Sequence, residues 1–367
     1  VVATQSNLVN EGDAARGLFG ILASAWTFAL VLVQPTSSFR VVSQERNEDT
    51  WDLVELTGMR PRQILRGLLL ASMVQGLLYT SALAPFMVMA YLLRGLDLIT
   101  IGVTLVVVPM AGVAASSLAV FCACLGNNKA TRALLGSLIG IGLSVAWLFG
   151  AAFLFAGVMR GRAFYFLGWG TEEWLACGLL VNMWIAFVVL MIVLSGALLT
   201  FRAANRSSAP RALWFLLLLN SLVWCLTISW MESSPGVTSD IGEVLAFFGF
   251  AGVLWALVLG IFAISEDYEL SPRQARAITD AKPWSRPFML FLGPGAARGR
   301  LAYVAMATAS LIIAWIGAWI EGAIGSTRAS DVSRALAGTW ADFCYSAIIL
   351  VITDVLYRGV LARFFST

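Results

Sequence analysis

The chain has 367 residues, of which 59% are hydrophobic and 12% are charged, and its mean hydropathy is +0.84. Soluble globular proteins contain about 45–50% apolar residues, so this composition predicts a polytopic membrane protein. The net charge of +3 does not favour a nucleic-acid partner, and the absence of histidine excludes bis-histidine haem, the common catalytic zinc sites and any histidine proton relay.

Nine apolar runs approach or exceed the roughly 20 residues that an α-helix needs to cross a bilayer. They predict an all-α fold, a polytopic membrane helix bundle of about nine transmembrane helices. The runs are Gly17–Val33, Leu68–Leu93, Ile101–Leu125, Ala133–Val158, Trp174–Phe201, Leu213–Met231, Ile241–Ile264, Leu301–Ile320 and Trp340–Leu361.

The cysteines do not indicate a metal or redox site. Cys122 and Cys124 are separated by one residue, which is not the spacing of a zinc-binding or redox pair. All five cysteines lie inside apolar runs, so we interpret them as small buried hydrophobic residues and predict neither metal ligands nor a disulfide framework.

A charged segment, residues 43–67, interrupts the apolar chain between the first two runs. Such a concentration of charge cannot lie in lipid, so it predicts a loop on one face of the membrane. If this loop is cytoplasmic and the runs alternate, 18 of the 24 Lys and Arg residues lie inside and six lie outside. This excess agrees with the rule that basic residues accumulate on the cytoplasmic side, and it places residue 1 outside.

Within the charged segment the sequence predicts two helices separated by a stop. Asp49 or Thr50 is a suitable N-cap for a short helix, TWDLVEL, and Gly58 permits the left-handed turn that ends it. Pro61 suits the first turn of a second helix, which continues into the next apolar run.

This segment resembles the first cytoplasmic loop of ABC-2 type transporter permeases. In that family a Glu-Arg pair precedes a Gly-Thr step, an acidic, leucine-containing helix and a T-G/P-x-x-P/S-R-x-I-L-x-G-K run. The corresponding residues are Glu45-Arg46, Thr50, TWDLVEL and TGMRPRQILRG. Asp49 stands where the family usually has Gly, and the order Arg-Gly replaces Gly-Lys at the end. By layout the resemblance covers residues 1–201, but its specific part is this loop.

The resemblance implies a permease subunit of an ATP-driven exporter, in a bacterial cytoplasmic (inner) membrane, that pairs with itself or a similar permease. It implies that a separate ABC ATPase subunit docks on a coupling-type helix in the charged segment. A solvated loop that only fixes the topology is the alternative. The coupling residues would be Glu45, Arg46, Thr50, Trp51, Asp52, Glu55, Gly58, Arg60 and Arg62.

The family layout also bears on the first residues. ABC-2 permeases generally start inside with an additional span, so the resemblance implies that the native first span is missing and that residues 1–16 end an external loop. A genuine outside N-terminus is the alternative.

The chain has no G-x-x-x-x-G-K-[ST] motif, which is the usual phosphate-binding loop of ATPases. We therefore predict that the chain is not an enzyme and carries no cofactor of its own. ATP and Mg would bind to the partner subunit.

An aromatic, glycine-rich segment at residues 159–174 is predicted to lie outside. In ABC-2 permeases the corresponding region holds short re-entrant helices, which makes Phe164, Tyr165, Trp169 and Trp174 candidates for an external gate. An interfacial aromatic belt is the alternative, because such side chains suit the headgroup zone.

The composition changes after residue 201, where a polar, basic stretch follows the fifth run. We predict a permease core at 1–201, a cytoplasmic linker at 202–212 and a four-helix membrane extension at 213–367. The extension includes a charged cytoplasmic loop at 265–300.

Asp354 is the only carboxylate well inside an apolar run, and Arg358 follows it by four residues. An ion pair at a helix end is one interpretation, and an intramembrane proton or ion site is the other. The scarcity of such groups argues against a secondary transporter, which is one alternative function. A non-transporting subunit that anchors or organises a larger membrane complex is another.

Overall fold

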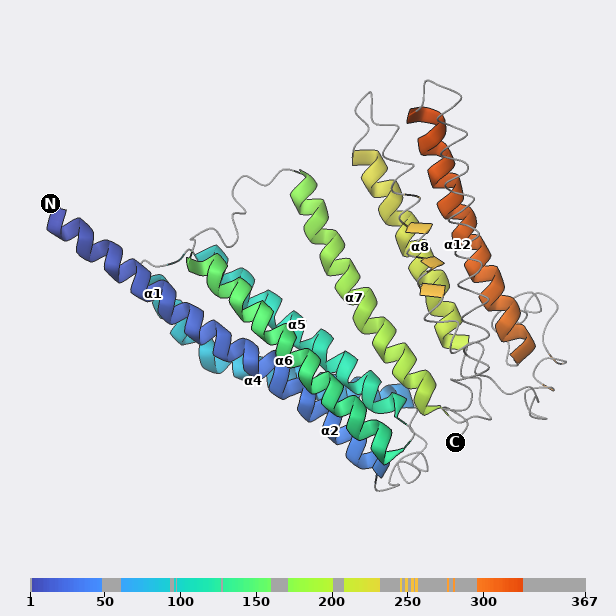
Figure 1. The fold of residues 1–367 in the computed structure, drawn as a ribbon, viewed down its shortest axis with the longest axis horizontal. Helices are drawn as coiled ribbons and strands as arrows, with labels where there is room; N and C mark the ends of the chain where they lie inside the picture. The colour runs from blue at the N-terminus through green and yellow to red at the C-terminus, as the bar shows by residue number, and fades with distance from the viewer. Residues whose placement is uncertain are drawn as a thin grey trace. The chain divides into compact units, whose positions relative to one another are not determined.

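The structure is a computed structural model in which all regular structure of the described residues is helical (Figure 1). The described residues are 2–47, 61–92, 96, 98–126, 128–159, 171–200, 208–231 and 296–325, with 245, 248–249, 252–253, 255–256, 276 and 280. They confirm the predicted all-α class for this part of the chain. The chain divides into two compact units, Val1–Leu199 and Thr200–Thr367.

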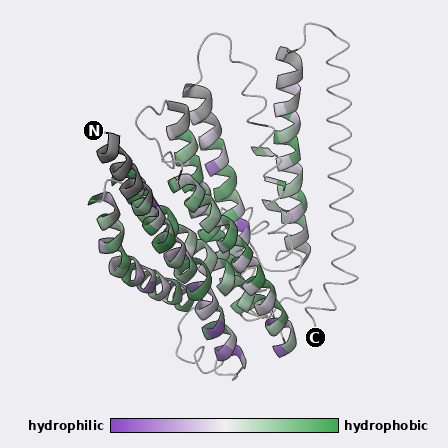
Figure 2. Cartoon of the chain, turned by 60° about the vertical axis from the view of Figure 1, so that its left-hand side comes forward, coloured by the Kyte–Doolittle hydropathy of each residue, from purple (hydrophilic) through white to green (hydrophobic). Residues whose placement is uncertain are grey.

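Among the described residues, the helices that are long and apolar enough to cross a membrane lie in the first unit, and they correspond to the first five predicted runs. Hydrophobic residues cover most of their length (Figure 2). By helix length and hydropathy the chain is therefore a multi-pass membrane protein. These five spans are Ala14–Arg46, Gln63–Met89, Leu98–Leu125, Lys129–Met159 and Trp174–Leu199.

The first helix is much longer than the predicted run Gly17–Val33. It consists of α1 (Val2–Phe28), a π-helical segment η1 (Ala29–Val33) and α2 (Gln34–Asn47), which follow one another without a break. Residues 2–16, which the resemblance places at the end of an external loop, are helical in the structure, and their position outside the membrane stays a prediction. The 33-residue span Ala14–Arg46 is about 50 Å long at 1.5 Å per residue, which exceeds the roughly 30 Å hydrocarbon core.

Proline explains the π segment. Pro35 has no N–H group, and in a regular α-helix its ring would clash with the carbonyl of Val31. The turn before it is widened instead, so that the N–H of Gln34 donates to the carbonyl of Ala29. Thr36 donates to two carbonyls of the preceding turn at 2.8 and 2.9 Å, which compensates for bonds that the proline disrupts.

Four further helices complete the first unit. The first of them begins at Pro61, as predicted, because proline is tolerated where a helix N–H would be unsatisfied anyway. They are α4 (Pro61–Leu92), α5 (Leu98–Leu125), α6 (Lys129–Met159) and α7 (Thr171–Leu199).

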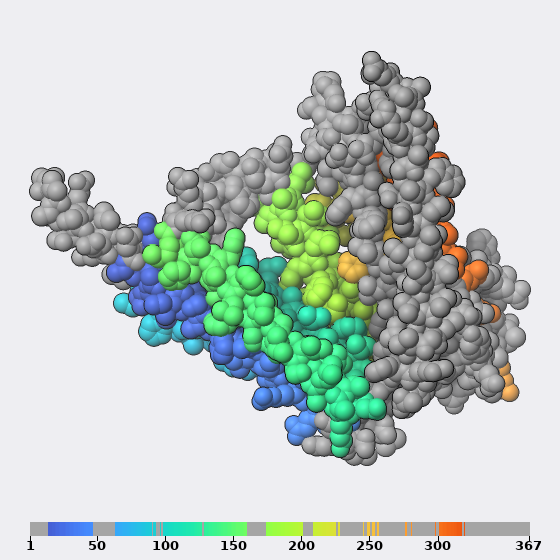
Figure 3. Space-filling model, viewed as in Figure 1, coloured from blue at the N-terminus to red at the C-terminus, as the bar shows by residue number. Residues whose placement is uncertain are grey.

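Helix α6 lies along the first helix and runs antiparallel to it (Figure 3). Near its start, Gly136 faces the ring of Phe39. Further along, the indole N–H of Trp147 donates to the carbonyl of Ser24 at 3.1 Å, and the Trp147 ring meets Phe28 edge to face with centroids 5.2 Å apart. These contacts fix the register of the two helices.

Two clusters of buried hydrophobic side chains lie among the described residues of the first unit. Each cluster combines residues of the first helix with residues of α4 and α5, so the core lies around the first helix and not around α6. One cluster contains Phe19, Ala23, Trp26, Leu30, Met87, Leu96, Ile101, Val108 and Val158, and the other contains Val42, Leu65, Leu69, Val120, Ala123, Cys124 and Leu199.

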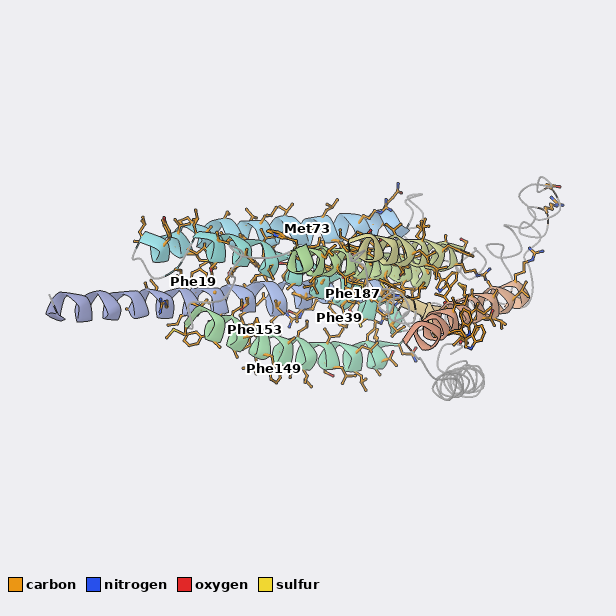
Figure 4. All side chains as sticks on the ribbon, turned by 90° about the horizontal axis from the view of Figure 1, so that it is seen from above. Phe19, Phe39, Met73, Phe149, Phe153 and Phe187 are labelled. Carbon is orange, nitrogen blue, oxygen red and sulfur yellow. The ribbon has the colours of Figure 1, made fainter. Side chains whose placement is uncertain are left out.

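The outer faces of α4 and α6 are apolar and exposed. Met73 of α4 is 39% exposed, and Phe149 and Phe153 of α6 are 74% and 76% exposed. Figure 4 shows Met73 and Phe149 on opposite sides of the first helix. Apolar side chains that point outward from spans of this hydropathy contact lipid, so both sides of the bundle are lipid-facing in the isolated chain.

The second unit contains α8 (Ser208–Met231) and α12 (Ala296–Gly325). Helix α8 begins before Leu213, so part of the predicted linker 202–212 is helical. The apolar parts of these helices, Ser208–Trp224 and Leu301–Gly317, are shorter than a full span. Most of the predicted spans and loop in the remainder of this unit lie outside the described residues, and the count of nine transmembrane helices stays a prediction.

Candidate functional site

The structure describes four of the residues that the sequence singled out. Glu45 and Arg46 lie in the last turn of α2, Arg62 lies in the first turn of α4, and Trp174 lies in the first turn of α7. The remaining candidates lie outside the described residues: Thr50, Trp51, Asp52, Glu55, Gly58, Arg60, Phe164, Tyr165, Trp169, Asp354 and Arg358.

Arg46 connects the end of α2 to the end of α5. Its Nη1 donates to the carbonyl oxygen of Cys124 at 2.6 Å and to that of Ala123 at 3.3 Å. The last four carbonyls of a helix have no partner within the helix, and a cation at this end also interacts favourably with the helix dipole. Arg46 therefore caps α5 from a neighbouring helix. Its predicted role in coupling to an ATPase stays a prediction.

The two helices that flank residues 48–60 are packed together close to these residues. Val42 of α2 and Leu65 and Leu69 of α4 are buried in one cluster with the last turns of α5. Glu45, in contrast, has an exposed side chain. Both ends of the charged segment are thus attached to the same end of the bundle, and the acidic side chain beside them faces outward.

Trp174 is 56% exposed at the start of α7. This exposure agrees with either interpretation of the aromatic segment, because a gate residue and an interfacial belt residue both lie at the end of a span. The other predicted gate residues, Phe164, Tyr165 and Trp169, lie outside the described residues, so a gate at this position stays a prediction.

No family model, curated protein or solved structure matches this chain. The resemblance to ABC-2 permeases therefore rests on the charged segment alone. Further information on the site comes from the geometry of the described helices.

That geometry reveals a buried polar residue that the sequence analysis did not single out. Gln34 follows the first apolar run, so hydropathy places it beyond the end of the span. In the structure its side chain is 1% exposed, and its Nε2 donates to the carbonyl oxygen of Ser72 in α4 at 2.9 Å. The available signal was Pro35, because a proline after a long apolar run can mark a distorted turn inside a helix as well as its end.

Glycines on two neighbouring helices make room for the widened turn. A Cβ atom on Gly112 of α5 would lie 3.0 Å from the carbonyl oxygen of Leu30, and a Cβ atom on Gly76 of α4 would lie 3.0 Å from Oε1 of Gln34. Both distances are shorter than ordinary van der Waals contacts. A larger residue at position 112 would press on the backbone of the first helix, whereas one at position 76 would press on the side-chain amide of Gln34.

We refer to Gln34, Ser72, Gly76 and Gly112 as the Gln34 layer. Its polar members are neutral, and the described residues contain no group of three or more His, Cys, Asp or Glu side chains that could hold a metal ion. The layer can therefore donate and accept hydrogen bonds, but it does not provide the charge that a metal or proton site requires.

Proposed function

We propose that this multi-pass membrane protein is the permease subunit of an ATP-driven exporter of the ABC-2 type, energised by a separate ATPase subunit in a bacterial cytoplasmic membrane. The observation that supports the proposal best is the position of the charged segment. It joins α2 to α4, and the adjoining ends of both helices pack on α5 through Val42, Leu65 and Leu69. The end of α2 is also hydrogen-bonded to α5 through Arg46.

This arrangement suits the transmission of force. A partner that moves residues 48–60 would act on helix ends that are packed together and would move α2, α4 and the end of α5 as one body. If the segment were joined to the bundle by frayed or unpacked ends, the same movement would be lost in the connections. The chain would supply the transmitting helices, and the partner would bind and hydrolyse ATP.

Isolation of the chain from its native membrane with its partners tests this proposal. The expected result is co-elution of an ATPase with the wild-type chain, and loss of that ATPase from a variant in which Trp51→Ala is combined with Asp52→Lys and Glu55→Lys. The partner cleft would lose its aromatic anchor and meet repulsive charges. A matched control reverses two charges in the predicted cytoplasmic loop 265–300, with Glu266→Lys and Asp267→Lys, and should retain the ATPase.

Other outcomes would assign the chain to a different class. A stable native complex that contains no ATPase would contradict the proposal and favour an anchoring or organising subunit. A gradient-driven flux that is abolished by Asp354→Asn, in membranes that contain no associated ATPase, would favour a secondary transporter.

A further inference from the structure

Several buried polar atoms of the described residues have no hydrogen-bond partner. Among them are Oε1 of Gln34, the residue after the π segment, and Oγ of Ser116 in α5. Gln34 is 1% exposed and Ser116 is 0% exposed, so neither atom reaches bulk solvent. Buried polar atoms in proteins are nearly always hydrogen-bonded to protein or to ordered water, and both of these therefore require a partner.

The lack of a partner at Ser116 is unusual within the same helix. Its neighbour Ser117 donates to the carbonyl of Ala114 at 2.8 Å, and Thr104 donates to the carbonyl of Thr100 at 2.7 Å. Serine and threonine in membrane helices commonly form such bonds within their own helix. The Ser116 hydroxyl does not, and it is available to a group outside α5.

The register of the helices places Gln34 and Ser116 at about the same height in the bundle. The first helix and α5 run in the same direction, because Leu30 packs on Gly112 near their middles and Arg46 reaches Cys124 at their ends. Gln34 follows Leu30 by four residues, and Ser116 follows Gly112 by four residues. Both residues thus follow the Leu30–Gly112 contact by about one turn, or roughly 5–6 Å.

The hydrogen-bonding capacity of the two groups defines the partner. Oε1 of an amide can only accept, whereas a hydroxyl can donate and accept. The surroundings are neutral, and a metal cation would require more oxygen ligands than these two side chains supply. A water molecule can donate one hydrogen to Oε1 of Gln34 and accept the hydrogen of the Ser116 hydroxyl, which satisfies both groups with one bond each.

We propose that Gln34 and Ser116 together bind one internal water molecule beside the π segment. This site is independent of the proposed function, because it depends only on the packing of the first helix against α4 and α5. The water joins the widened turn to α5, while the Nε2 bond to Ser72 joins it to α4. The widened turn before Pro35 is thereby hydrogen-bonded to both α4 and α5.

A double-mutant cycle tests the shared partner, with the melting temperature of the purified chain in detergent micelles as the readout. Gln34→Met removes both the Oε1 acceptor and the Nε2 bond to Ser72 with little change in length, and Ser116→Ala removes the hydroxyl. If one water serves both groups, Ser116→Ala lowers the melting temperature in the wild-type background and has less than half of that effect in the Gln34→Met background. Ser117→Ala is the matched control, and its shift should be the same in both backgrounds.

Equal shifts for Ser116→Ala in the two backgrounds would overturn the proposal. A structure of the lipid-embedded chain at a resolution that shows ordered water provides the second, direct measurement. The expected result is a water peak within about 2.6–3.2 Å of both oxygens, which is lost in the Ser116→Ala variant. Coupling in the cycle combined with a direct Gln34–Ser116 hydrogen bond and no water peak would also refute the proposal.

Discussion

The contact between Arg46 and the end of α5 predicts how strongly one side chain stabilises the first unit. Arg46→Met keeps a side chain of similar length but removes every hydrogen-bond donor. The bond to Cys124 at 2.6 Å is short and charge-assisted, and such bonds contribute about 1.5–3 kcal/mol. The bond to Ala123 at 3.3 Å is long and adds little. Because Arg46 is only partly buried, we expect a loss of about 2 kcal/mol in the free energy of unfolding.

This loss can be measured as a change in melting temperature. For a unit of about 200 residues, 1 kcal/mol corresponds to about 2–4 °C, so Arg46→Met should lower the melting temperature of the purified chain by about 4–8 °C. Arg46→Lys keeps the charge at the helix end but loses the guanidinium geometry, and should have an intermediate effect.

Arg40→Met is the matched control, because Arg40 is an exposed cation on the same helix. Substitutions of exposed residues usually change stability by less than about 0.5 kcal/mol, so this variant should melt close to the wild type. If Arg46→Met and Arg40→Met had the same melting temperature, the capping role of Arg46 would be refuted.

Two further predictions use the same thermal assay. Gly112→Ala should destabilise the chain by about 1–3 kcal/mol, because its Cβ would lie 3.0 Å from the Leu30 carbonyl. In contrast, Gly102→Ala on the same helix, with no atom within 4 Å of its Cβ, should be neutral or stabilising; equal destabilisation by both variants would contradict the close packing. Phe19→Ala, at a residue that is 0% exposed, should lower the free energy of unfolding by about 1–3 kcal/mol because it leaves a cavity. This loss is smaller than for a phenylalanine in the core of a water-soluble protein, because lipid is as apolar as the core. Phe153→Ala, at a residue that is 76% exposed, should cost less than about 0.5 kcal/mol, and an equal cost for both would show that Phe153 is not lipid-facing.

The sequence was sufficient to predict a helical, multi-pass membrane protein and the middle of each span in the first unit. Long apolar runs have few alternatives to a membrane helix, because every backbone polar group in lipid must be satisfied within the protein. The start of α4 was also predictable, since Pro61 favours a first helical turn.

The course of the first helix could not be predicted in the same way. The residues after Val33 are polar, and hydropathy alone places them outside the membrane. The structure keeps them helical because Thr36 and Ser38 bond to carbonyls of their own helix and the Gln34 amide finds an acceptor in α4. These compensations depend on tertiary contacts, which hydropathy does not contain.

The contact of Arg46 was unpredictable for a related reason. An arginine in a charged loop can face a partner, the lipid headgroups or another helix, and only the register of α2 against α5 distinguishes these environments. The sequence predicted a functional surface at this position, and the structure adds a bond within the chain that any test of coupling must take into account.

The Arg46 bonds also have a consequence for how substitutions are tolerated. Their acceptors are main-chain oxygens, which almost every amino acid presents in the same place. Position 46 should therefore accept very few residues in a saturation screen. Ala123 and Cys124, which are 0% and 2% exposed in a hydrophobic cluster, should accept other small residues that suit an apolar environment. Screening for expressed and membrane-inserted protein would then find one position that requires a long hydrogen-bond donor, opposite two positions that require only small, weakly polar side chains.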